Sequence, residues 1–298
     1  MSTSVMSFPE RGKWGNSKWR GNCSGHVYKA LFEQYQPKSF CDPMMGSGTS
    51  IEVAKEMGIQ AFGLDLHQGF NALKHSILDA IGQEVDLNVS HPPYGQMIRY
   101  SKEVWGSVAH PDDLSECIDD DDFHEKLHLV LMNQREATKA GSFYGTLVGD
   151  LRKDGRYVSY QAEAISRMPA NELASVIIKT QHNNVSDSRT YSHMKHFRIM
   201  HEYLILWQKP KAPLSLLIDL SAMANKHAKR LHGVWKVIVA HAMMALGGKA
   251  SLNDLYQKIA EDAPDKLKSN ENWQAKVRQT LQLYPKFNSV ERGVWALA

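Results

Sequence analysis

The segment KSFCDPMMGSGTSIEVAKEMGIQAFGLD (residues 38–65) holds two short apolar runs with an amphipathic stretch between them. Residues 38–41 and 60–65 predict strands, and residues 51–57 predict a helix that ends at Gly58. The glycine-rich turn DPMMGSGT joins the first strand to this helix. Strands and helices that alternate with such short connections indicate a parallel sheet with right-handed crossovers.

The same alternation continues on both sides of this segment. Upstream, residues 22–36 predict a helix that Ser24 could cap and that ends before Pro37. Downstream, helices are predicted at residues 71–81, 123–139 and 163–168, and strands at 85–89, 142–148, 175–179 and 203–208. The sequence therefore predicts an α/β fold with a mostly parallel, Rossmann-like sheet.

The composition changes at KPKAP, residues 209–213. Beyond it the sequence predicts a helix at 214–231, three further helices at 234–246, 252–260 and 272–283, and a hairpin at 287–297. Three helices followed by two short strands are typical of a winged helix-turn-helix. We therefore predict a first domain at 1–210, a linker helix at 211–232 and a winged-helix module at 233–298, for which a packing or dimerisation role is the alternative.

Composition and charge indicate which classes of location and partner the sequence favours. The 298 residues are 43% hydrophobic, and no apolar run reaches the roughly 18 residues of a membrane span. The N-terminus lacks a secretory signal, and three cysteines without a metal-like pair fit free thiols in the cytoplasm. Residues 207–298 hold 14 Lys/Arg against 7 Asp/Glu, which indicates a polyanionic partner for the C-terminal third.

Three chemically informative segments follow predicted strands. Asp42 and the glycine-rich turn follow the first strand, Asp65 ends the second, and His91-Pro92-Pro93-Tyr94 follows the third. Because the carboxyl ends of parallel strands line one crevice, we expect these segments to meet. Glycines let the backbone approach a ligand, and a carboxylate at the next strand end can accept both ribose hydroxyls. The turn is not G-x-G-x-x-G, which disfavours a nicotinamide cofactor.

These motifs together resemble DNA amino-methyltransferases that use S-adenosylmethionine. DPMMGSGT resembles their D-P-x-x-G-S-G-T cofactor loop, and HPPY resembles their [DNS]-P-P-[YFW] catalytic motif. NCSGHVYKALFEQY is similar to the segment that closes over the methionine end, and HEYLILWQK (201–209) is similar to a late strand. The order of these motifs matches the circular permutation named gamma, and the resemblance covers about residues 12–208.

The resemblance implies the following site residues. S-adenosylmethionine would be bound by Asn22, Ser24, Asp42, Pro43, Met44, Gly46, Ser47, Gly48, Thr49 and Asp65, with helix capping as the alternative for Ser24. The catalytic residues would be His91, Pro92, Pro93 and Tyr94. Tyr94 would stack on a base flipped out of the duplex.

His91 departs from the family pattern, which has Asp, Asn or Ser at this position. The position must accept a hydrogen bond from an exocyclic amine, and an imidazole accepts one only when neutral. Adenine N6 is favoured as the target over cytosine N4. A non-catalytic DNA-binding regulator on a methyltransferase fold is the alternative that this substitution supports.

The C-terminal residues resemble winged-helix modules of restriction–modification proteins. This resemblance places Lys276 and Arg278 on the third helix, which such folds insert in the major groove, and Arg292 at the wing. Arg189, Lys195 and Arg198 lie in a polar loop and would contact the DNA backbone. The expected partner is double-stranded DNA, with no membrane and no metal. A homodimer, a cognate restriction nuclease and a nucleoid location are compatible with this interpretation.

One further motif, H-E-x-x-H at residues 124–128, has the spacing of a zinc-protease helix. No convincing third ligand follows it, and methyltransferase-like segments flank it on both sides. We therefore expect a surface helix there, whose first turn is preceded by the acidic residues 119–122.

Overall fold

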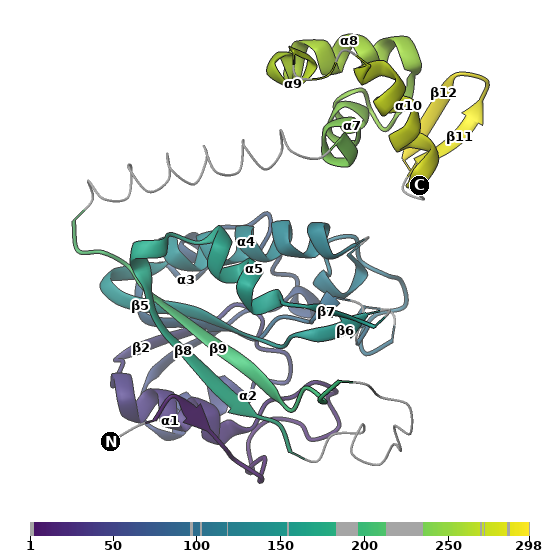
Figure 1. Cartoon of the computed structure of the whole chain (residues 1–298). Helices are drawn as coiled ribbons and strands as arrows, with labels where there is room; N and C mark the ends of the chain where they lie inside the picture. Colours follow the sequence, from purple (N-terminus) through teal and green to yellow (C-terminus); the bar gives the residue numbers. More distant parts are fainter. Residues whose placement is uncertain are drawn as a thin grey trace. The chain divides into compact units, whose positions relative to one another are not determined.

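The protein, described by a computed structural model, forms two compact units, Met1–Leu217 and Ile218–Ala298 (Figure 1). The structure describes residues 3–95, 98–101, 103–117, 119–153, 155–182, 196–212, 235–268, 270, 272–284 and 287–297. Arg189, Lys195 and most of the predicted linker helix (211–232) lie outside these residues. In the described parts of the chain, no helix is both long and apolar enough to cross a membrane.

A seven-stranded sheet forms the centre of the first unit. Its strands in spatial order are β1 (Val5–Met6), β8 (Leu173–Thr180), β9 (His201–Gln208), β5 (Thr138–Val148), β4 (Val85–Ser90), β2 (Ser39–Asp42) and β3 (Gln60–Gly63). All neighbours are parallel except β9, which runs antiparallel to both β5 and β8. The predicted fold class, a mostly parallel Rossmann-like α/β sheet, is confirmed.

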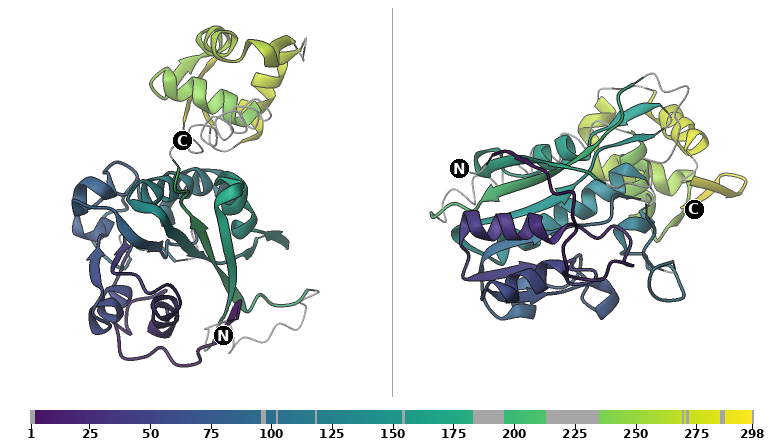
Figure 2. Two further views of the ribbon diagram at one scale, coloured as in Figure 1. Left: turned by 90° about the vertical axis from the view of Figure 1, so that its left-hand side faces the viewer. Right: turned by 90° about the horizontal axis from the view of Figure 1, so that it is seen from below.

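Helices cover both faces of this sheet. The helices are α1 (Gly25–Tyr35), α2 (Thr49–Glu56), α3 (Ile77–Ile81), α4 (Asp120–Glu136) and α5 (Tyr160–Arg167). Figure 1 shows α1 and α2 on one face and α3, α4 and α5 on the other, and from below α1 lies in front of the sheet (Figure 2). Successive side chains of β9 point to opposite faces of the sheet. Leu204 and Leu206 pack with α1 and α2, whereas Ile205 and Trp207 pack with α4 and α5.

Two elements differ from the sequence prediction for a clear physical reason. The helix expected at 71–81 begins only at Ile77, because Asn133 of α4 accepts from the Ile77 backbone N–H (2.9 Å) and donates to the carbonyls of Ala72 and His75. These tertiary hydrogen bonds replace the ones that a first helical turn would make. After β5, an unpredicted antiparallel hairpin forms from β6 (Leu151–Lys153) and β7 (Arg156–Val158).

The strand order creates a crevice at one edge of the sheet. From β2 the chain moves outward to β3, then crosses back to place β4 on the other side of β2. The connections that leave β2 and β4 therefore diverge at their carboxyl ends. In open α/β sheets, ligands bind at such a switch point.

The second unit has its own apolar core around three longer helices. Its elements are α7 (Trp235–Ala245), β10 (Lys249–Ser251), α8 (Leu252–Asp262), α9 (Pro264–Lys268), α10 (Trp273–Leu283), β11 (Phe287–Glu291) and β12 (Val294–Leu297). The strands form an antiparallel sheet in the order β10-β12-β11. The strand β10 and the short helix α9 were not predicted. Ser251 and Asp254 form a capping box that begins α8 directly after β10.

Candidate functional site

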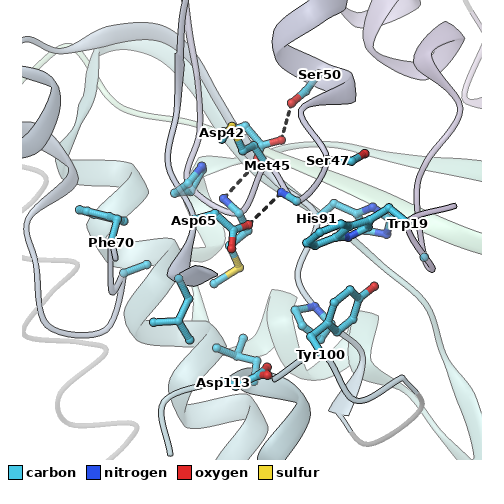
Figure 3. Close-up of a pocket in the computed structure, with 18 of the residues that line it drawn as sticks. Trp19, Asp42, Met45, Ser47, Ser50, Asp65, Phe70, His91, Tyr100 and Asp113 are labelled. Carbon is cyan, nitrogen blue, oxygen red and sulfur yellow. Dashed lines mark hydrogen bonds between the residues drawn. The ribbon is translucent and has the colours of Figure 1, made fainter. Parts of the chain in front are cut away.

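One cavity lies at the carboxyl ends of β2, β3 and β4 (Figure 3). Asp42 is the last residue of β2, Asp65 follows β3 by two residues, and His91 directly follows β4. All three line the cavity, whose empty space of about 830 Å³ includes its open mouth. The structure therefore brings together the three segments that the sequence predicts to meet.

Most of the residues that the resemblance implies line this cavity. They are Asn22, Asp42, Pro43, Met44, Gly46, Ser47, Thr49, Asp65, His91 and Pro93. Ser24, Gly48, Pro92 and Tyr94 are not among the lining residues. Ser24 is buried, accepts from the His26 N–H and donates to the Glu10 carbonyl (2.8 Å), so it caps α1. Gly48 is the N-cap of α2.

The glycine-rich turn needs its glycines at specific positions. Gly46 (φ 52°) and Gly48 (φ 84°) adopt left-handed conformations that other residues rarely tolerate. A Cβ on Gly46 would lie 3.0 Å from the Trp19 indole nitrogen. The turn therefore passes closely beneath Trp19 and leads directly into the N-terminus of α2.

Asp42 fastens this turn to α2. Its carboxylate accepts from the Ser50 hydroxyl (2.6 Å) and from the Met44 N–H (3.0 Å), and its side chain is buried. Burial raises the pKa of Asp42 to about 7, although both hydrogen bonds act in the opposite direction. Asp42 therefore holds the loop in shape from beneath the cavity.

Asp65 connects the same turn to the end of the next strand. One carboxylate oxygen accepts from the Gly46 N–H (2.8 Å), and the other accepts from both the backbone and the ring of His67. The hydrogen bond from His67 to this carboxylate raises the imidazole pKa. Each carboxylate oxygen has two lone pairs, so acceptor capacity remains on the Gly46 side.

His91 is held from one side by Tyr94. The His91 Nε2 lies 2.7 Å from the Tyr94 hydroxyl, which also donates to Oε1 of Glu202 (3.0 Å). Burial lowers the pKa of His91 to about 4, with Glu202 raising it and Lys179 lowering it further. The imidazole is therefore neutral at physiological pH.

Tyr94 is not among the residues that line the cavity. Its ring packs beside Gly149, where a Cβ would lie 3.1 Å from the Tyr94 Cε2, and its hydroxyl is shared by His91 and Glu202. In this structure Tyr94 thus supports His91 from the protein side instead of offering a ring face to the cavity.

Other aromatic side chains line the cavity, and sequence reasoning missed them. Figure 3 shows Trp19 and Tyr100 near His91, with Phe70 on the far side of Asp65. Trp19 and Tyr100 have ring centroids 6.4 Å apart, and the Tyr100 hydroxyl donates to the Arg20 carbonyl. These residues come from loops without hydrophobic periodicity. The only sequence signal was aromatic residues near the motifs.

The closing segment reaches the cofactor loop through Asn22. Its side-chain carbonyl accepts from the Thr49 hydroxyl (2.6 Å), and its amide donates to the Asn16 carbonyl (2.9 Å). Asn22 therefore joins the segment before α1 to the first residue of α2, at the wall of the cavity.

The predicted DNA-contacting residues that the structure describes are all outside the cavity. Lys276 and Arg278 are exposed on α10, and Arg292 is exposed between β11 and β12. Arg198 is half-buried just before β9.

The helix with the H-E-x-x-H pattern contributes to the core. On α4, His124 is buried beside Phe123 and Tyr160, so the expectation of a surface helix is wrong for this face. Asp119 caps α4 by accepting from the Asp122 N–H. Among the described residues, no group of three or more His, Cys, Asp or Glu could hold a metal ion.

Comparisons with known proteins end at the level of similar folds. No protein-family model and no curated protein matches the sequence. Among solved structures, TrmN from Thermus thermophilus matches with 14% identity over 64% of this chain and 51% of its own, with a TM-score of 0.41. The 16S rRNA methyltransferase RsmC from T. thermophilus, in complex with AdoMet and guanosine, matches with 13% identity over 65% and 45%, with a TM-score of 0.33.

A third similar structure, also from T. thermophilus, is a provisionally named DNA modification methylase complexed with S-adenosyl-L-methionine. It matches with 22% identity over 48% of this chain and 54% of its own, with a TM-score of 0.31. This chain thus spans about half the length of each of the three proteins.

Proposed function

We propose that this protein transfers a methyl group from S-adenosylmethionine to the exocyclic amine of a base in DNA, with adenine N6 favoured over cytosine N4. The observation that carries the proposal is the position of His91. A neutral imidazole lines the same cavity as the glycine-rich turn and Asp65. The cavity therefore contains both a hydrogen-bond acceptor for an amine, His91, and groups that could bind a nucleoside, the glycine-rich turn and Asp65.

The residues present fit the cofactor. In Figure 3, Asp65 lies between Phe70 on one side and His91 on the other. Asp65 would accept hydrogen bonds from the ribose hydroxyls, and Phe70 would pack against the adenine. Because Gly46 has no side chain, the protein backbone could pass close to the bound cofactor at this turn. Bound there, S-adenosylmethionine supplies an electrophilic methyl group on a sulfonium sulfur, which leaves as a neutral thioether.

His91 would prepare the amine of the target base. The nitrogen lone pair of an exocyclic amine is conjugated with the ring, so the free base is a poor nucleophile. A hydrogen bond from the amine to His91, with a second to a proline carbonyl of the same turn, would turn the lone pair toward the methyl group. One amine proton is then released through His91 to solvent as the nitrogen–carbon bond forms. Most of the rate enhancement would come from this positioning.

Aromatic side chains would hold the target base. The amine is unreachable inside a duplex, so the base must leave the stack. Trp19 and Tyr100 line the cavity near His91, and stacking on such a ring contributes roughly 1–3 kcal/mol per base. We assign to these two residues the role that the sequence suggested for Tyr94.

Two features support DNA as the substrate. The second unit has the element order helix, strand, two helices with a short one between them, and two strands, which fits a winged helix-turn-helix with α10 as recognition helix. Lys276, Arg278 and Arg292 are exposed there. In the first unit, the β6–β7 hairpin follows the carboxyl end of β5 and carries the exposed Arg152 and Arg156, which suit phosphate contacts.

The test is incubation with labelled S-adenosylmethionine and duplex DNA, followed by nucleoside analysis. We expect label in methylated deoxyadenosine. Label in methylated deoxycytidine would show that cytosine is the target base. Label only in RNA, offered in a parallel reaction, would show that the substrate is RNA and not DNA. DNA binding without transfer to any base would favour the non-catalytic regulator and contradict the proposal.

Two variants make this test specific to His91. His91→Ala removes the acceptor and should abolish transfer, whereas His91→Asn supplies an amide oxygen and should retain it. Calorimetric titration with the cofactor should give similar affinities for both, because His91 is assigned to the amine. Full activity of His91→Ala would remove His91 from the mechanism.

A further inference from the structure

A chain of polar groups, with Glu202 buried and the others partly buried, leads from the sheet to His91. Lys179 on β8 and Glu202 on β9 face each other as cross-strand partners, with Nζ 2.5 Å from Oε2. Burial raises the pKa of Glu202, but the charge of Lys179, the effect of His91 and the hydrogen bonds of Lys179 and Gln181 bring the net pKa below the usual value. Glu202 is therefore an ionised carboxylate, which can only accept hydrogen bonds.

Tyr94 links this carboxylate to the imidazole. Its hydroxyl oxygen lies 3.0 Å from Oε1 of Glu202 and 2.7 Å from Nε2 of His91. Burial, and then the charge of Glu202, raise the pKa of Tyr94 well above its usual value, so the hydroxyl keeps its proton.

The single hydroxyl proton can satisfy only one of the two neighbours. If it pointed to His91, the lone pairs of Tyr94 and of the buried Glu202 carboxylate would face each other at 3.0 Å. That contact is repulsive, so the proton lies between Tyr94 and Glu202. The Tyr94 oxygen then presents a lone pair to Nε2 of His91, and this nitrogen must carry the ring proton.

We propose that Tyr94, oriented by Glu202 and Lys179, fixes His91 as the Nε2–H tautomer and leaves Nδ1 as the acceptor nitrogen for the substrate amine. Tyr94 is thus a positioning residue. A neutral imidazole has one proton and one free lone pair, and which nitrogen has which is set by the partner of the other nitrogen. Among the described residues no hydrogen bond to Nδ1 of His91 is present. Its use as the amine acceptor rests on the proposed function.

Nitrogen-15 NMR of the full-length protein with labelled histidine rings tests the tautomer directly. The His91 signals are identified by their loss in His91→Asn. At neutral pH, without cofactor or DNA, we expect the proton on Nε2. A proton on Nδ1, or an even mixture of tautomers, in the unmodified protein would overturn the inference whatever any variant does.

Tyr94→Phe removes the hydroxyl and keeps the ring. We expect the His91 proton to distribute over both nitrogens, and the single-turnover rate of methyl transfer to fall about 10-fold to 100-fold with unchanged cofactor affinity. Tyr203→Phe is the matched control, because the Tyr203 hydroxyl lies 2.9 Å from Nε2 of His201 on the same strand as Glu202. It should change neither the His91 tautomer nor the rate.

The outcomes separate the inference from the proposed function. If Tyr94→Phe left both the tautomer and the rate unchanged, Tyr94 would not be the group that fixes the ring. A fixed Nε2–H tautomer that Tyr94→Phe releases, in a protein that methylates no base, would support the role of Tyr94 while contradicting the proposed reaction.

Discussion

The acid–base state of His91 gives the proposed reaction a characteristic pH dependence. The imidazole accepts a hydrogen bond only in its neutral form, and burial lowers its pKa from 6.5 to about 4. The charged groups that face it are Glu202 from β9 and Lys179 from β8, whose opposite effects on the pKa are smaller than that of burial. As pH falls, the acceptor is therefore lost near pH 4, well below the range of a solvent-exposed histidine.

We accordingly expect His91 to give kcat/KM an acidic limb near pH 4, separate from any change near pH 7, where burial places the pKa of Asp42. The measurement is an initial-rate profile with labelled cofactor, with circular dichroism at each pH to monitor folding. His91→Asn, which has no titratable ring, should lack this acidic limb. A limb centred near pH 6.5 that is present in the unmodified protein and absent in His91→Asn would show that His91 titrates like a solvent-exposed histidine.

The sequence predicted which residues stand at the strand ends that form the site, but not where their side chains point. Asp42, Asp65 and His91 could be placed because each follows a strand, and the sheet then fixes their separation. Tyr94 could not, because its orientation depends on Glu202, which lies 108 residues further along the chain. Trp19 and Tyr100 were missed for a related reason: their loops have no period that would indicate a direction.

Among the secondary-structure elements, α4, β5 and the 3-10 turn just before β8 (Ala170–Glu172) are joined by a buried ionic cluster. Glu172 accepts from Nε of Arg135 (2.8 Å) and from the Tyr144 hydroxyl (2.5 Å), and a second guanidinium nitrogen also contacts it. All three side chains are buried. Removing one charged partner from such a cluster destabilises the fold, because the opposite charge is then left buried without a counter-charge.

We therefore expect Glu172→Ala to lower the free energy of unfolding by about 3–5 kcal/mol, measured by urea denaturation. The matched control is Glu33→Ala, which removes an exposed i,i+4 partner of Lys29 at 4.0 Å and should cost less than about 1 kcal/mol. Equal losses in the two variants would show that the Arg135 charge is solvated despite its burial.

The longer strands of the large sheet and the longer helices were predictable because their apolar patterns are local, whereas their ends and directions were not; the short strands β1, β6, β7 and β10 were not predicted. The start of α3 depends on Asn133 from another helix. The antiparallel direction of β9 was not readable from HEYLILWQ, since a strand buried on both faces has the same composition in either direction. The hairpin of β6 and β7 is short and polar, so it gave no strand pattern.

Charge is unevenly distributed along the chain, and under the proposed function the basic C-terminal third contacts DNA. Residues 207–298 carry a net charge of +7, against −4 for the remainder. In the second unit, Lys276 and Arg278 are exposed on α10, where their side chains donate to the neutral side chains of Gln279 and Tyr256. Neither of these contacts neutralises the charge, so both cations remain available to phosphate groups.

The double substitution Lys276→Gln and Arg278→Gln should therefore weaken DNA binding through the ionic component. Each phosphate contact adds about 0.9 to the slope of log K against log salt concentration, so losing two should reduce that slope by about 2. Fluorescence anisotropy of labelled duplex DNA from low to moderate salt measures it. Lys258→Gln is the control, because Lys258 on α8 is paired with Asp262 at 2.9 Å and should leave the slope nearly unchanged. If the double variant kept the full slope, α10 would not contact the backbone, and the DNA affinity would have to come from the wing, where Arg292 lies, or from the first unit.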